Sequence, residues 1–253
     1  MKTCYTIHNR PQQEDIMPNI LIAGIGSGGC QMLSRLYDSG FVSERLAAID
    51  TDVVALNSSS ISTRLQIGQA QTRGQGSGAD INIGKASATE DSESLAALLQ
   101  DAELLILVVG LGGGTGTGAA PVVAEIAHNM GIRTVAYATL PFEFEGSHCA
   151  QRAKEGLVQL ARAVDAAIPL PLEEYASSRE NTSLVEAFRC ADAVLRVKLE
   201  AICSAMNELR LVGVDGVLKN EPVVQLPPET ETATKKSRFK KLLRFLRIKK
   251  RLK

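Results

Sequence analysis

Two glycine-rich segments contain the residues of this sequence that are best suited to chemistry. The first spans residues 24–29 (GIGSGG) and the second spans residues 110–118 (GLGGGTGTG). Glycine lets a backbone approach phosphate oxygens closely, and N–H groups at the start of a helix point toward such an anion. Five glycines and two threonines fall within residues 112–118, and no ordinary turn type requires so many glycines. The second segment therefore predicts a nest of N–H groups around a di- or triphosphate, with threonine hydroxyls as further donors.

The first segment also allows two other interpretations. It fits the pattern GxGxxG, and Asp50 follows at about the distance of a ribose-binding acid, which together would indicate a dinucleotide-dependent oxidoreductase. A glycine-rich turn between a strand and a helix can also reflect tight packing alone. The second glycine segment and the lack of an evident catalytic His or Lys argue against the oxidoreductase. No lysine follows either segment in the Walker A position, which excludes a P-loop NTPase.

Strand and helix patterns alternate along the chain around these segments. Apolar runs predict buried strands at residues 19–26, 46–52, 104–110, 134–140 and 166–172. Apolar spacing predicts helices at residues 30–40, 93–102, 119–131, 150–164 and 183–210. This alternation predicts one α/β domain with a parallel, doubly wound, Rossmann-like sheet.

The composition excludes several classes of protein. Aromatic residues make up 4% of the 253 residues and Trp is absent, which argues against a stacking surface for single-stranded nucleic acid. No apolar run is long enough to span a bilayer, and residues 1–15 contain no apolar stretch typical of a signal peptide. The five cysteines form no CxxC pair, so we expect reduced cytosolic thiols, no disulfide framework and no metal site of protein ligands.

The charge is divided unevenly between the body of the chain and its C-terminal end. Residues 235–253 hold 11 of the 28 Lys and Arg and no acid, which leaves 17 basic against 28 acidic residues in 1–234. We predict a flexible N-terminus over residues 1–18 and a linker rich in Pro, Glu and Thr over 219–234. A C-terminal segment with 11 positive charges on an otherwise acidic chain indicates that residues 235–253 bind a partner separately from the rest of the protein.

The C-terminal residues 235–253 predict a basic amphipathic helix. Phe239, Leu242, Leu243 and Leu246 share one stripe by their i, i+3, i+4, i+7 spacing. This pattern is typical of a helix that lies on anionic lipid, and we expect the segment from Lys235 to Lys253 to bind such a membrane. Nucleic acid and an inert or protein-binding role are the alternatives. We favour lipid because a phosphate-binding arm does not need leucines in register.

The segment GGGTGTG (112–118) resembles the signature of the tubulin/FtsZ superfamily, and its extension AAPVVAEIA resembles FtsZ in particular. The resemblance covers about residues 19–218. Five further segments resemble the family in the same order: GIGSGGCQM (24–32), AAIDTDVVALN (47–57), TRGQGSGADINIGKA (72–86), PFEFEG (141–146) and EAFRCADAVLR (186–196). In the second of these, Asp50 stands where FtsZ usually has asparagine. It implies a GTP-binding domain with a long central helix, GTP or GDP as the ligand with Mg²⁺ as a candidate companion, and self-association into a dimer or polymer. The role implied is membrane remodelling or a division-like process in a prokaryotic cytoplasm, at the inner face of the cell membrane.

The resemblance also implies a set of nucleotide contacts. Carried over by position, they are Gly26, Ser27, Gly28, Cys30 and Gln31 at the α- and β-phosphates; Gly114, Thr115 and Gly116 along the phosphate chain; Ser77, Gly78 and Ala79 near the γ-phosphate; Thr139, Pro141 and Glu145 at the ribose; Asp50 in the loop after the second strand; Phe188 stacked on guanine; and Asp192 accepting from the N1 and N2 donors of guanine. Judged by local pattern alone, Phe188 would be a core residue and Asp192 part of a solvated helix face.

The sequence departs from the family at positions that matter for activity. Cys149 replaces an arginine near the sugar and γ-phosphate, Leu140 replaces the arginine of a TRPF motif, and Leu172 replaces the asparagine of an IPND motif. The catalytic loop NxDxxD is matched by residues 213–218 (GVDGVL), in which only Asp215 is retained. We therefore expect slow hydrolysis that depends on Asp215, or, as the alternative, a non-hydrolysing, nucleotide-gated membrane scaffold. The second FtsZ domain is expected to be absent, which puts an ordinary filament in doubt.

Overall fold

The computed structural model describes residues 19–41, 43, 45–176 and 183–211. Contacts within the chain divide it into residues 1–219 and 220–253, and the second unit lies wholly outside the described residues. Four predictions from the sequence therefore stay untested by the structure: the N-terminal segment 1–18, the loop residue Asp215, the linker 219–234 and the basic tail 235–253.

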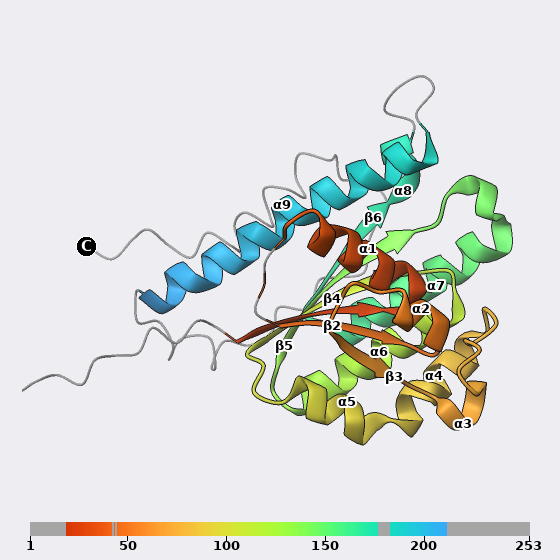
Figure 1. The fold of residues 1–253 in the computed structure, drawn as a ribbon, viewed down its shortest axis with the longest axis horizontal. Coiled ribbons are helices and arrows are strands. Elements are labelled where there is room, and N and C mark those ends of the chain that lie inside the picture. The colour runs from red at the N-terminus through yellow and green to blue at the C-terminus, as the bar shows by residue number, and fades with distance from the viewer. Residues whose placement is uncertain (1–18, 42, 44, 177–182, 212–253) are drawn as a thin grey trace, which may run out of the picture. The chain divides into compact units, whose positions relative to one another are not determined.

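The described residues build one six-stranded, fully parallel sheet with the strand order β3-β2-β1-β4-β5-β6 (Figure 1). The strands are β1 (Ile20–Ile25), β2 (Arg45–Asp50), β3 (Thr63–Gln66), β4 (Leu104–Gly110), β5 (Arg133–Leu140) and β6 (Ala166–Pro171). This order confirms the predicted doubly wound, Rossmann-like α/β fold, and it reverses direction between β1 and β4. Strand β3 was not predicted, because this edge strand has four residues, none of them fully buried, and therefore no apolar run.

Ten helices connect and cover the described strands. They are α1 (Gly26–Asp38), α2 (Val53–Asn57), α3 (Gln69–Thr72), α4 (Ile81–Glu90), α5 (Ser92–Leu99), α6 (Gly114–Asn129), the 3₁₀ helix η1 (Glu143–Glu145), α7 (Ser147–Ala163), α8 (Leu172–Ala176) and α9 (Leu184–Leu211). All five predicted helices are present. The two that follow the glycine segments begin four and five residues earlier than predicted: α1 starts at Gly26 and α6 at Gly114, so most of each glycine segment is the first turn of a helix rather than a loop.

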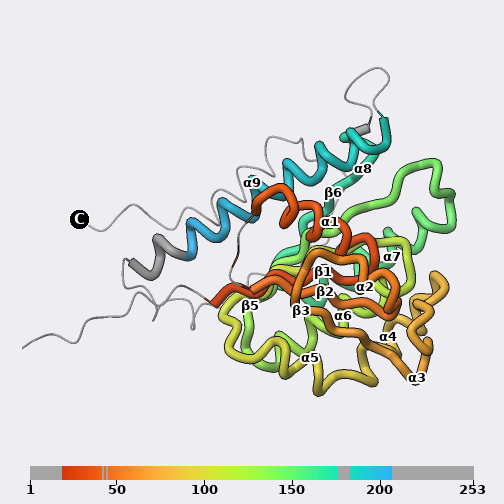
Figure 2. Tube along the Cα trace, in the orientation of Figure 1, coloured from red at the N-terminus to blue at the C-terminus, as the bar shows by residue number. Residues whose placement is uncertain are grey.

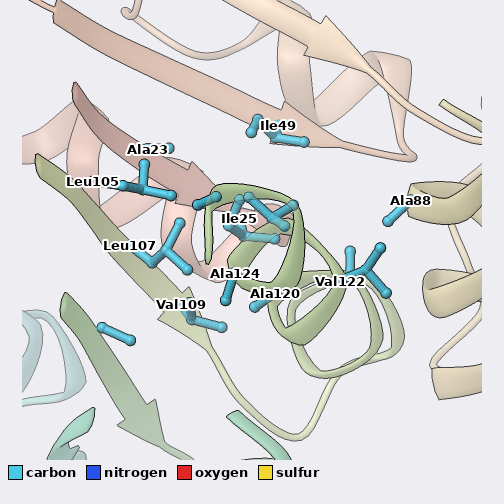
Figure 3. Close-up of a cluster of buried hydrophobic side chains, with 14 of the residues drawn as sticks. Ala23, Ile25, Ile49, Ala88, Leu105, Leu107, Val109, Ala120, Val122 and Ala124 are labelled. Atoms are coloured by element: carbon cyan, nitrogen blue, oxygen red, sulfur yellow. The ribbon is translucent and has the colours of Figure 1, made fainter. Parts of the chain in front are cut away.

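The sheet separates two buried apolar clusters. On one face, Ala120 and Ala124 of α6 lie over strand residues such as Ile25 and Leu107 (Figure 3). The small alanines let this helix approach the strands closely. On the other face, α1 and α9 run alongside each other (Figure 2), and α9 buries Leu195 and Leu199 in the same cluster as Leu33 of α1. The two ends of the described chain thus cover one face together.

Several glycines are required by close contact between backbones. A Cβ atom on Gly29 would lie 2.2 Å from the carbonyl oxygen of Val108, and one on Gly116 would lie 2.3 Å from that of Gly110. On Gly118 it would lie 2.1 Å from the carbonyl oxygen of Ile81. Packing of helix on strand and helix on helix therefore already requires glycine at these three positions, whether or not a phosphate binds there. Gly113 alone in that segment has nothing within 4 Å of such a Cβ.

We expect Gly118→Ala to lower the free energy of unfolding by about 1–3 kcal/mol, the usual cost of overpacking. The direction of this change distinguishes close packing from an open position, because Gly→Ala in an exposed helix interior raises the free energy of unfolding by about 1 kcal/mol. The measurement is urea unfolding of the full chain. The control Gly113→Ala lies in open space at the N-cap of α6 and should cost less than about 1 kcal/mol. A Gly118→Ala variant as stable as the parent would contradict the packing argument.

Candidate functional site

The candidate site lies at the carboxyl ends of β1 and β4, where α1 and α6 begin. These strands pair in parallel with Ile25 opposite Val109, so both helices start at the same edge of the sheet. A Cβ atom on Gly26 would lie 2.7 Å from the backbone nitrogen of Gly116. Two helix N-termini therefore converge at the position where strand order reverses, which is the usual ligand position in an open α/β sheet.

The first turn of α1 offers backbone and small polar groups to solvent. Ser27, Gly28 and Gln31 are exposed. Cys30 points the other way: its thiol donates to the carbonyl oxygens of Gly24 at 3.3 Å and Ile49 at 3.5 Å, and burial raises its pKa to about 12. The Cys30 side chain is thus part of the core, and only its backbone could face a phosphate.

Asp50 connects the end of β2 to the start of α1. Its carboxylate accepts from the Ser27 hydroxyl at 2.7 Å and from the Thr51 backbone N–H at 2.7 Å. The residue is 1% exposed, and burial raises its pKa above the ordinary value of an aspartate. Both oxygens of this carboxylate are thus already bonded to protein groups. These bonds argue against Asp50 as the ribose-binding acid of a dinucleotide site, and they weaken the oxidoreductase alternative.

Hydroxyl groups join three loops beneath the start of α6. The Thr115 hydroxyl lies 2.7 Å from that of Thr51 and 3.0 Å from that of Ser77, while the Thr117 hydroxyl accepts from the Gly112 N–H at 2.9 Å. All four side chains are buried. Both threonine hydroxyls are thus bonded to protein groups, and their donation to phosphate stays a prediction. Their effect is to fix the spacing of the loops whose backbone faces the site.

The loop before α4 forms another wall of the site. Gly78 and Ala79 are exposed and both have left-handed backbone angles, with φ of 58° and 64°. Asp80 then caps α4 by accepting from the Asn82 N–H at 2.7 Å. This loop and Arg152 of α7 line a shallow cavity of about 420 Å³. Arg152 donates from Nε to the Gly112 carbonyl oxygen at 2.8 Å.

The residues expected at the ribose follow β5. Thr139 and Pro141 are half-buried, and the Glu145 carboxylate accepts from the Phe142 N–H at 2.8 Å, which closes η1 on itself. The Cys149 thiol lies 3.8 Å from Glu145. The structure therefore brings these three residues to the same edge of the sheet as the two glycine segments.

Phe188 and Asp192 of α9 meet Arg35 of α1. Arg35 binds Asp192 through two hydrogen bonds, from Nε to Oδ2 at 2.6 Å and from Nη2 to Oδ1 at 2.9 Å. The Arg35 guanidinium also lies 5.1 Å from the centre of the Phe188 ring, and Phe188 packs edge-to-face on Phe142 at 5.4 Å. Asp192 is 9% exposed, so its placement on a solvated face is wrong. The Asp192 carboxylate therefore already has a charged partner in the structure.

Sequence reasoning missed Arg35 and Arg152. Arg35 is separated from Asp192 by 157 positions, so no local pattern links them. Arg152 stands in a run of polar and charged residues that reads as an ordinary solvated helix face. Both are identified only once the strand order places α1 beside α9 and α7 beside the loop at residues 78–82.

Two further features concern other kinds of site. Within residues 19–211, as far as the structure describes them, no three His, Cys, Asp or Glu side chains gather closely enough to hold a metal ion. None of the described helices combines the length and apolar character needed to cross a membrane.

Known sequences resemble this chain over the same region. A family model described as the tubulin/FtsZ family, GTPase domain, matches residues 19–177. The cell division protein FtsZ of Aquifex aeolicus is 39% identical over 149 residues, which are 59% of this chain and 41% of the relative. The cell division protein FtsZ 1 of Pyrococcus abyssi is 36% identical over 158 residues, or 62% of this chain and 42% of the relative. The chain thus spans about two fifths of the length of these curated relatives.

Solved structures share the fold. An empty FtsZ dimer from M. jannaschii is similar with a TM-score of 0.71 and 36% identity, over 77% of this chain and 57% of that one. CetZ2 from Haloferax volcanii, solved as a GTPγS-bound protofilament, is similar with a TM-score of 0.66 and 26% identity, over 75% of this chain and 59% of that one. These matches agree with the doubly wound sheet and confirm the resemblance seen in the sequence.

We expect Asp50→Asn to stabilise the protein at pH values above the ordinary pKa of an aspartate. Because the folded-state pKa of Asp50 is raised, the folded protein holds this proton more tightly than the unfolded chain, and stability is lost as pH rises through that pKa. Asparagine has no charge to bury, and its amide can keep the bonds to Ser27 and Thr51. The gain, measured by urea unfolding across pH, should shrink toward about pH 4. Asp38→Asn, which removes an exposed carboxylate, should not reproduce this pH-dependent gain.

Proposed function

Because this chain belongs to the tubulin/FtsZ family and carries its GTPase domain, we propose that residues 19–218 bind GTP or GDP. The observation that carries this proposal is the convergence of the first turns of α1 and α6 at the switch point of the sheet. Backbone N–H groups at both turns face the same space, and their partial positive charges favour a polyphosphate.

The nucleotide would lie across the edge formed by these turns. Its α- and β-phosphates would contact the first turn of α1 and the turn from Gly114 to Gly116. The γ-phosphate would approach Gly78 and Ala79, and the ribose would approach Thr139, Pro141 and Glu145. Mg²⁺ would be held mainly by phosphate oxygens and water, as is usual for this ion. The buried hydroxyls of Ser77 and Thr115 would position loops rather than bind phosphate.

Guanine would be selected by α9. Asp192 would accept from the N1 and N2 donors of guanine, a pair that adenine does not offer, and Phe188 would cover the face of the base. In the structure both groups contact Arg35. Base binding would therefore be an exchange in which Arg35 leaves the Asp192 carboxylate and guanine replaces it.

If Asp192 selects the base, Asp192→Asn should lose affinity for GTP and gain affinity for XTP. An asparagine side chain accepts from N1–H and donates to the O2 of xanthine, whereas it meets the N2 amine of guanine donor to donor. We expect a preference for GTP to change into one for XTP by at least tenfold, measured with fluorescent analogues of both nucleotides. Glu186→Gln, an exposed change on the same helix, should leave the preference intact. An Asp192→Asn variant that still prefers GTP would rule out this role.

Assembly and hydrolysis are proposed for the full chain. A protein of this family has been solved as a dimer and another as a protofilament, which supports self-association here. Gly213 and Leu218 replace polar residues of the family's catalytic loop, so hydrolysis would be slow and would depend on Asp215. The alternative that these replacements favour is a nucleotide-gated scaffold without turnover.

The basic tail would bring the protein to a membrane. Eleven cations and a stripe of leucines and phenylalanines over residues 235–253 suit the surface of an anionic bilayer, and each cation near such a surface contributes about 1 kcal/mol before screening. The protein would then be cytoplasmic and peripheral to the cell membrane, in a remodelling or division-like role.

GTP turnover measured against protein concentration, with and without anionic liposomes, tests this function. We expect specific turnover to rise with concentration and on liposomes, because a shared site needs a neighbour, and we expect Asp215→Ala to abolish turnover while bound nucleotide is retained. Bound GTP without turnover at any concentration would support the scaffold. A chain that ignores liposomes at low salt would remove the membrane role, and a chain that binds no guanine nucleotide would remove the proposed function altogether.

A further inference from the structure

The shallow cavity beside the first turn of α4 has a single cationic side chain in its wall. Its lining is made of Gly78, Ala79, Asp80, Ile81, Asn82 and Arg152. The first five residues are one continuous loop and helix start, and Arg152 faces them from α7. The lining therefore offers backbone amides and one guanidinium to an anion. Its one carboxylate, that of Asp80, already accepts from the Asn82 N–H at 2.7 Å.

Arg152 is held in place without having its charge balanced. Its Nε donates to the Gly112 carbonyl oxygen, which uses one of the five N–H donors of a guanidinium. Across the part of the chain that the structure describes, Arg152 forms no ion pair with a carboxylate. The Cys149 thiol lies beside it. Burial, and to a smaller extent the negative charge of Glu145, raises the pKa of this thiol, so the thiol stays neutral and does not balance the charge of Arg152. A half-buried cation with unused donors thus faces the cavity.

The surrounding contacts indicate that an anion in this cavity would be the end of a polyphosphate bound at α1 and α6. The start of α6 touches α1 on one side, at Gly26 and Gly116, and the loop before α4 on the other, where a Cβ on Gly114 would lie 2.7 Å from the Asp80 nitrogen. A polyphosphate that begins at α1 and crosses the first turn of α6 is therefore directed toward the loop at residues 78–82. Arg152, bonded to Gly112 two residues before α6, stands at the end of that path.

We propose that Arg152 binds the terminal phosphate of a nucleoside triphosphate and so distinguishes triphosphate from diphosphate. This inference rests on the proposed nucleotide function and adds a residue and a specificity to it. The diphosphate ends at α6 and leaves Arg152 with its single bond to Gly112. The triphosphate extends one group further and gives the guanidinium an oxyanion partner.

The test compares the affinities of the full chain for GTPγS and for GDP in Arg152→Gln and Arg152→Lys variants. Glutamine can keep the hydrogen bond to Gly112 but has no charge, whereas lysine keeps the charge. We expect Arg152→Gln to weaken GTPγS about 10- to 100-fold, the range of a hydrogen bond to a charged group, with less than about a threefold change for GDP. Lysine should restore most of the GTPγS affinity. Arg162→Ala, an exposed change on the same helix, should alter neither.

The possible results distinguish failure of the Arg152 assignment from failure of nucleotide binding itself. Equal weakening of GTPγS and GDP by Arg152→Gln, or no weakening of either, overturns the assignment of Arg152 while leaving nucleotide binding in place. A variant that loses both nucleotides is checked by its urea unfolding midpoint, and if it is folded, the selective role is refuted. A parent chain that binds neither nucleotide refutes the proposed function itself.

Discussion

The direct contact between the backbones of α1, β4 and α6 is the constraint on which the rest of the site depends. Gly29 lies against the Val108 carbonyl, and Gly26 lies against the backbone of Gly116. Any side chain at these positions would push the helices apart. Because the helices touch, their first turns open onto one shared space at the edge of the sheet, and the loops from the other strands can close around it.

A buried polar network then holds those loops at fixed spacing. The hydroxyls of Thr51, Ser77 and Thr115 form a chain across three loops, and the Asp50 carboxylate ties β2 to Ser27 at the start of α1. Such a network is costly to leave partly unsatisfied, so it stabilises one arrangement of these loops. In the proposed site, these side chains would position the loops, and the backbone groups would contact the ligand.

The sequence allowed the sheet to be predicted more completely than the site. Buried apolar runs identified β1, β4 and β5, but β3 depends on pairing with β2 and has no apolar pattern of its own. Glycines marked the right place, although packing explains several of them better than a ligand does. The roles of Arg35 and Arg152 could not be predicted, because each follows from contacts between segments far apart in the chain.

If Asp192 binds the base as proposed, its ion pair with Arg35 is an internal competitor of the base. This carboxylate already accepts two hydrogen bonds from Arg35. When a base replaces Arg35, the net gain in binding free energy is only the difference between the base–carboxylate and the Arg35–carboxylate interactions. A base with two matched donors can replace the guanidinium at little net cost. A base without them that displaced Arg35 would leave a largely buried carboxylate unpaired, so it would be rejected through a lost partner rather than through a clash. Discrimination in the proposed pocket would then depend on the hydrogen bonds that Arg35 gives up as much as on those that the base provides.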